Sequence, residues 1–308
     1  MPSTDLPFYE RVYRRLLSEK TRETAERTIV LIAIFSFAVH LLLLAAVHLG
    51  WIPDGGFAKL TGDPIVAVYT PFSFILIYEV YLLVYYLPKS ITRYIGKQYE
   101  IITLIVIRKI FGDISHLEFT ADWFNVEGDI QFTYDIIASV LLFFLIYLFY
   151  YLNSKRAEIR YAEGPSGKKI GNFVKVKKIL AGILVPLFFI LAAYNLGSWA
   201  QSIFSVGLSS AEASDVNNIF FEDFFTVLIL ADVFLLLFSF LHTDKFHQTI
   251  RNSGFVISTV LIKMSFGEEG LTGTILTVVA VIIGVLMLFI HNRFEKLEQE
   301  VAKKSDEN

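Results

Sequence analysis

The sequence predicts an all-α integral membrane protein with eight transmembrane helices, arranged as two parallel four-helix repeats. Hydrophobic residues make up 55% of the chain and charged residues 19%, whereas soluble domains average about 45–50% and about 25%. The mean hydropathy is +0.56. The apolar residues gather in blocks of about 20, the length that an α-helix needs to cross about 30 Å of hydrocarbon. The two halves of the chain also resemble each other, which predicts the repeat.

The chain begins with a charged stretch, residues 1–28, that we expect to form an amphipathic arm on the inner membrane surface. It opens no short apolar core, so we expect no cleavable signal peptide. The apolar side chains of the arm that can face lipid are Leu6, Phe8, Val12, Tyr13, Leu16 and Leu17.

Six apolar segments read as clear membrane spans, and two shorter segments also carry charge. The clear spans are Ile29–Ile52, Val66–Leu87, Thr133–Leu152, Ile179–Trp199, Phe221–Leu241 and Leu271–His291. The shorter segments are Glu100–Leu117 and Asn252–Gly267. Whether these two cross the membrane decides the topology.

The distribution of lysine and arginine favours eight crossings over six. These residues mark the cytoplasmic side when they lie in short loops, and residues 153–178 alone contain eight of them. Residues 118–135 contain five carboxylates and no base, and residues 201–223 contain four carboxylates and no base. Eight spans put the basic segments inside, whereas six would put residues 153–178 outside. We therefore expect both termini in the cytoplasm and the protein in a cytoplasmic (inner) membrane.

The repeat is visible at several aligned positions. Residues 72–85 align with residues 225–238 without a gap, and residues 107–113 align with residues 262–268 after a two-residue insertion. Four spans per copy is an even number, so both copies face the same way. The predicted organisation is the arm 1–28, a first repeat 29–152, a basic linker 153–178, a second repeat 179–291 and a charged tail 292–308.

Each repeat carries one acid and one base inside its apolar segments. Glu79 and Asp232 hold matching places in two spans, and Arg108 and Lys263 follow them. A charge at the centre of a membrane costs about 2.5–3.5 kcal/mol on insertion scales, so it is kept only where something compensates. Counted from the segment ends, each acid and its base lie about 12 Å from the cytoplasmic boundary. We therefore expect a contact within each pair.

The favoured interpretation of these pairs is a pathway through the membrane for protons or a small cation. A carboxylate at this depth can bind a cation or pass a proton, and a facing base excludes other ions. The alternative is that the pairs only hold helices in register, in a membrane sensor or scaffold that transports nothing. The linker, arm and tail would then engage a cytoplasmic partner.

Other classes of site find less support in the sequence. The chain has no cysteine, so disulfides and thiolate metal sites are excluded. Haem held by His40 and His48 is disfavoured because the second repeat has no histidine at the aligned places. No catalytic motif such as HExxH or GxSxG is present, so we expect neither an enzyme nor a cofactor.

The expected partners are membrane lipids, a proton or small cation, and a second copy of the chain if it oligomerises; no nucleic acid is expected. Clustered bases next to a span contribute about 1 kcal/mol each to binding anionic lipid head groups. The linker residues expected to make such contacts are Lys168, Lys169, Lys175, Lys177 and Lys178.

Overall fold

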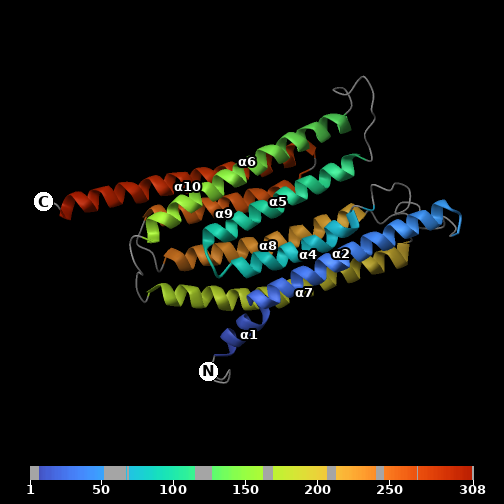
Figure 1. The fold of residues 1–308 in the computed structure, drawn as a ribbon, viewed down its shortest axis with the longest axis horizontal. Helices are drawn as coiled ribbons and strands as arrows, with labels where there is room; N and C mark the ends of the chain where they lie inside the picture. The colour runs from blue at the N-terminus through green and yellow to red at the C-terminus, as the bar shows by residue number, and fades with distance from the viewer. Residues whose placement is uncertain are drawn as a thin grey trace.

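The computed structural model describes residues 7–51, 67, 69–114, 127–161, 169–206, 213–240, 246–268 and 270–306. Within these ranges the chain forms long helices and no strand, which confirms the all-α prediction (Figure 1). The helices are α1 (Phe8–Leu16), α2 (Glu19–His48), α4 (Tyr69–Tyr86), α5 (Ile91–Ile114), α6 (Glu127–Tyr161), α7 (Lys169–Val206), α8 (Ala213–Phe240), α9 (Phe246–Phe266) and α10 (Gly270–Asp306).

Local sequence signals set the ends of α2. Ser18 caps its first turn, because the Ser18 hydroxyl oxygen accepts a hydrogen bond from the Thr21 amide at 3.1 Å. Just beyond its last turn, Gly50 has φ +73°, a conformation that glycine adopts without steric cost. Between these two signals the helix runs for 30 residues.

Three stretches of helix are long and apolar enough to cross a membrane, among the residues that the structure describes. They are Glu10–His48, Gly128–Ser154 and Gly270–Val301. Helix α2 also buries little of its apolar surface: only Ala33 and Leu44 are buried, while Leu31, Phe35 and Leu42 are each about two-thirds exposed or more. These features are compatible with a membrane protein.

From α2 to α6 and from α7 to α10, consecutive helices lie side by side, and the two halves of the chain have the same order of neighbours (Figure 1). Helix α4 packs between α2 and α5, and α5 packs against α6. In the second half, α8 packs between α7 and α9, and α9 packs against α10. The halves meet where α6 contacts α10, α5 contacts α9 and α4 contacts α7.

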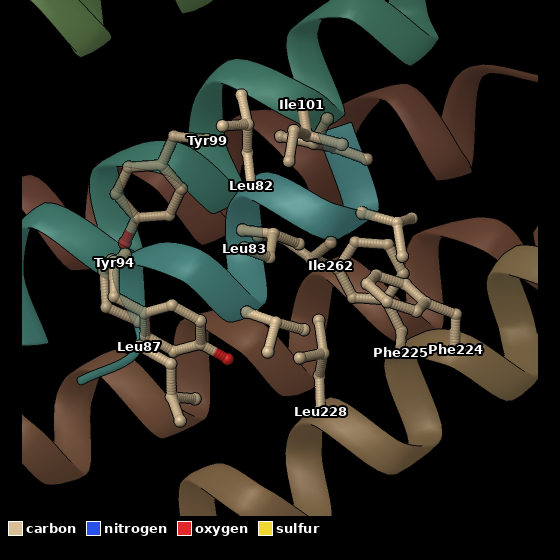
Figure 2. Packing of buried hydrophobic residues seen from close by; sticks show 14 of the residues in the cluster. Leu82, Leu83, Leu87, Tyr94, Tyr99, Ile101, Phe224, Phe225, Leu228 and Ile262 are labelled. Atoms are coloured by element: carbon tan, nitrogen blue, oxygen red, sulfur yellow. The ribbon is translucent and has the colours of Figure 1, made fainter. Parts of the chain in front are cut away.

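One hydrophobic core joins the two halves, as Figure 2 shows. Leu83 of α4, Leu87 in the turn that follows α4, and Phe225 and Leu228 of α8 all belong to this core, and all four side chains are fully buried. Ile262 of α9 completes this part of the core. The packing of α4 and α5 against α8 and α9 therefore fixes how the polar side chains on these helices meet.

The structure corrects two predicted loops. Residues 91–99 form the first turns of α5, and the chain turns within residues 87–90 instead of over residues 88–99. Likewise α9 begins at Phe246, six residues before the predicted segment. Helices α5 and α9 are thus 24 and 21 residues long, about 36 and 32 Å, which is enough to cross a bilayer.

The N-terminal arm also differs from the prediction. Helix α1 packs against α7, and Leu17, which we expected to face lipid, is 3% exposed. Tyr13 and Leu16 pack against the core as well. Part of the apolar face of the arm therefore contacts the protein itself, because α1 lies against α7.

Candidate functional site

Among the described residues, the most deeply buried contact between an acid and an amide lies between α8 and α5. Asp232 of α8 is 6% exposed, and its Oδ2 accepts a hydrogen bond from Gln98 Nε2 at 3.2 Å. Thr259 of α9 donates its hydroxyl hydrogen to Gln98 Oε1 at 2.8 Å. Gln98 and Thr259 are both fully buried. Three helices from both halves therefore converge on one carboxylate.

Two further polar groups lie next to Asp232. The hydroxyl of Tyr94, on α5, faces the carboxylate but falls short of hydrogen-bond geometry with it. Lys177 of α7 is 4% exposed and close enough for the charges of Asp232 and Arg251 to act on it. Tyr94 appears in Figure 2 at the edge of the shared core. The carboxylate thus has uncharged donors around it and a buried ammonium group nearby.

A small cavity adjoins this site. It lies between the α4–α5 turn, α8 and α9, and its polar lining comes from Asp232, Tyr94 and Asn252. The rest of the lining is apolar, including Leu87 and Phe255. The cavity has a volume of about 20 Å³, which is room for a water-sized species beside the carboxylate.

A second buried polar network starts about two turns before Thr259 on α9. Arg251 donates to Asn252 Oδ1 at 2.9 and 3.2 Å and contacts His291 Nε2 at 3.0 Å. Asn252 in turn donates to Ser239 Oγ at 3.1 Å. The ring of His247 stacks near that of His291, and its Nδ1 lies 2.9 Å from a Glu298 carboxylate oxygen. This network links the neighbourhood of Asp232 to the exposed last turns of α10.

Buried polar contacts also continue toward the opposite end of the bundle. The Tyr99 hydroxyl lies 2.9 Å from Ser258 Oγ, which in turn donates to the Ala280 carbonyl at 2.7 Å. Farther along, Thr274 donates to Asp135 Oδ1 at 2.6 Å. Hydroxyl and carboxyl groups therefore recur along the interface of α5, α6, α9 and α10.

The predicted contact between Glu79 and Arg108 is not formed. Glu79 is half-buried, and the charges that act on it are those of Lys97, Glu100 and Glu26. Glu79 lies about 11 Å from the end of α4, whereas Arg108 lies about 26 Å from the start of α5. The prediction failed because α5 begins nine residues earlier than the apolar segment, so the base lies deeper than expected.

The same displacement separates Asp232 from Lys263. Asp232 lies about 12 Å from the end of α8, and Lys263 about 26 Å from the start of α9. Asp232 is contacted by Gln98 instead, and Gln98 is in turn contacted by Thr259. Gln98 was not among the predicted site residues. It shares one helix face with Tyr94 and Ile102, which lie four residues before and after Gln98. That spacing was the available signal.

The linker lysines divide into different environments. Lys175 is exposed, as expected for a head-group contact. Lys177 is buried, so its predicted contact with head groups is wrong, and Lys178 binds both carboxylate oxygens of Glu10 at 3.0 Å. Lys168 and the side chain of Lys169 lie outside the described residues.

Among the described residues, no group of three or more histidines, cysteines or acids is placed to hold a metal ion. The site itself consists of one carboxylate, one amide and two hydroxyl groups. No protein-family model, curated protein or solved structure matches the chain.

Proposed function

We propose that the protein is a membrane channel or transporter that moves protons or a small cation through the site at Asp232. The observation that carries the proposal is a carboxylate that is 6% exposed, bonded by an uncharged amide and next to a cavity. A carboxylate buried between transmembrane helices is costly, and such groups commonly mark ion pathways and proton relays. The protein would move this species without changing it chemically, so we expect no enzymatic reaction.

The proposed layout has eight spans in two parallel repeats, with both termini in the cytoplasm. The shared order of helix neighbours in the two halves supports it. So does the direction of the helices, because α2 begins and α10 ends toward the same end of the bundle (Figure 1). Helix α6 also ends and α7 begins at that end (Figure 1), and the bases in these turns of α6 and α7 favour its placement on the cytoplasmic side.

Cysteine labelling tests this layout directly, because the chain contains no cysteine of its own. We expect Asp122→Cys to react with a membrane-impermeant maleimide in intact cells. Gly167→Cys should react only after the membrane is opened. Labelling of the Asp122→Cys variant only in opened cells would contradict the proposed orientation.

The two acids are expected to contribute unequally. Asp232 lies where the two halves meet, whereas Glu79 lies among Lys97, Glu100 and Glu26 of the first half. We therefore propose one route, centred on Asp232, with Glu79 at its margin. Arg108 and Lys263 would act at a distance, as charges that repel other cations.

Flux through the purified protein in liposomes tests the function. Asp232→Asn should reduce proton or cation flux to that of protein-free liposomes, because an amide neither binds a cation nor exchanges a proton as a carboxylate does. Glu79→Gln should retain most of the flux. Asp223→Asn is the matched control, since Asp223 lies exposed on the same helix. Unchanged flux in the double variant, Glu79→Gln with Asp232→Asn, would refute the proposal.

A sensor or scaffold that transports nothing is the second candidate. The observation favouring it is the docking of the arm: Lys178 binds Glu10, and the hydroxyl of Tyr81 donates to the Leu16 carbonyl at 2.9 Å. Such contacts could pass a signal between arm and bundle. This candidate predicts no flux above empty liposomes for the unmodified protein, for protons, Na⁺ or K⁺.

A further inference from the structure

We infer that the species bound at Asp232 is a proton, and that Gln98 and Thr259 form a two-position relay that follows its arrival and departure. The inference rests on the proposed function for the movement of the proton across the membrane. The relay itself rests on the hydrogen bonds among the three side chains. It names both the substrate and the residues that position it.

The ionised carboxylate corresponds to the arrangement in the structure. Gln98 directs its Nε2 toward Asp232 at 3.2 Å and its Oε1 toward the Thr259 hydroxyl at 2.8 Å. Both ends of the amide are therefore engaged, so its orientation is fixed. The Thr259 hydroxyl has two acceptors within reach, Gln98 Oε1 at 2.8 Å and the Phe255 carbonyl at 3.1 Å, and its shorter contact is with Gln98.

This arrangement is unsuited to a metal cation. Na⁺, K⁺ or a divalent ion needs several oxygen ligands directed at one point. Gln98 instead directs an N–H group at the carboxylate, and Tyr94 brings a hydroxyl that can donate to it. The ammonium group of Lys177 and the guanidinium group of Arg251 add positive charge nearby. A proton needs only one carboxylate oxygen.

The protonated carboxyl would be bonded equally well after two small rotations. A hydronium ion in the adjoining cavity gives its proton to Asp232, forming an O–H bond and leaving water. The new hydroxyl is a donor, so Gln98 turns its amide to present Oε1 to it and directs Nε2 at Thr259 Oγ1. The Thr259 hydroxyl then rotates and donates its hydrogen bond to the Phe255 carbonyl, whose oxygen already lies 3.1 Å from Thr259 Oγ1.

The hydrogen bonds that join the three side chains can be formed in both states. An amide and a hydroxyl are side-chain groups that can both donate and accept, which is what a reversible relay requires. A carboxylate that only held helices in register would be served as well by a lysine or arginine in direct contact. The choice of neutral partners on α5 and α9 therefore favours a site that changes its protonation state.

Two substitutions at Thr259 separate the relay from simple packing. Thr259→Val keeps the shape and removes the hydroxyl, whereas Thr259→Ser keeps the hydroxyl. The protein is titrated in lipid while infrared difference spectra record the carbonyl band of the protonated Asp232 carboxyl and the amide band of Gln98. The Asp232→Asn and Gln98→Leu variants identify the two bands by their loss.

In the unmodified protein and in Thr259→Ser, we expect the two bands to change together as the pH falls. In Thr259→Val the amide band should stay unchanged, and proton flux should fall by about tenfold or more, since one buried amide group loses its partner in each cycle. Equal melting temperatures for the Val and Ser variants would show that folding is not the cause.

The possible failures are distinguishable. An amide band that shifts in Thr259→Val as it does in the unmodified protein would refute the relay. Coupled bands in a protein that shows no flux would support the relay but refute transport as the function. Flux of Na⁺ or K⁺ that depends on Asp232 at constant pH would refute the proton as substrate.

Discussion

Adding one methyl group at residue 284 is expected to disrupt the packing between the two halves of the bundle. A Cβ atom on Gly284 would lie 1.6 Å from the Tyr99 hydroxyl oxygen and 2.6 Å from its Cζ. Tyr99 is fully buried, its ring packs edge-on to Phe149 at 5.1 Å, and its hydroxyl contacts Ser258. The tyrosine therefore has no free space into which it can move.

Gly284→Ala should for this reason lower the stability by about 1–3 kcal/mol, the usual cost of overpacking a core, or more. Thermal unfolding in detergent measures the effect. Gly182→Ala is the matched control, because a Cβ there would meet only a Val12 methyl at an ordinary 3.7 Å, and alanine favours a helix by about 0.5–1 kcal/mol over glycine. Tyr99→Leu should restore part of the loss. Similar melting of the two alanine variants would contradict the described contact between α5 and α10.

Removing Arg251 is the second change expected to have a large effect. Its guanidinium group donates to Asn252 Oδ1 and His291 Nε2, and all three side chains are buried. Because His291 Nε2 accepts this bond, the hydrogen of the neutral ring resides on Nδ1, which lies 3.2 Å from the His247 carbonyl. Arg251→Leu would leave two buried acceptors without a donor, at about 1–3 kcal/mol each.

We expect Arg251→Leu to melt well below the unmodified protein. Arg293→Leu is the control on α10, since Arg293 is exposed and lies over the Phe289 ring at 5.2 Å. Exposed substitutions of this kind usually change stability by no more than about 0.5 kcal/mol. Equal melting temperatures for the two leucine variants would show that the buried network does not stabilise the fold.

The helices themselves were predictable from the apolar blocks, but their ends were not. The predicted spans leave out residues 91–99, where Arg93 and Lys97 interrupt the apolar pattern, yet these residues form the first turns of α5. Helix formation depends on backbone hydrogen bonds, and charged residues with long side chains form helices well. The helix therefore continues past the apolar block, and every contact predicted from its supposed start was displaced.

The site was predictable in part. Asp232 stands out because a carboxylate in an apolar segment is costly and therefore conspicuous. Gln98 and Thr259 are uncharged and cost much less to bury, so they give little signal in the sequence. Gln98 also lies 134 residues from Asp232 along the chain, and no local periodicity relates positions so far apart. Their meeting depends on how the two halves pack.

That separation has a consequence for how the protein is assembled. During synthesis, the amide of Gln98 emerges 134 residues before the carboxylate that it bonds in the folded protein. Docking of α8 and α9 supplies both missing partners at once. The late half would thus recognise the early one through this pair of contacts. A chain released before α8 would lack both partners of the Gln98 amide, and cellular quality control would have a buried polar group to detect.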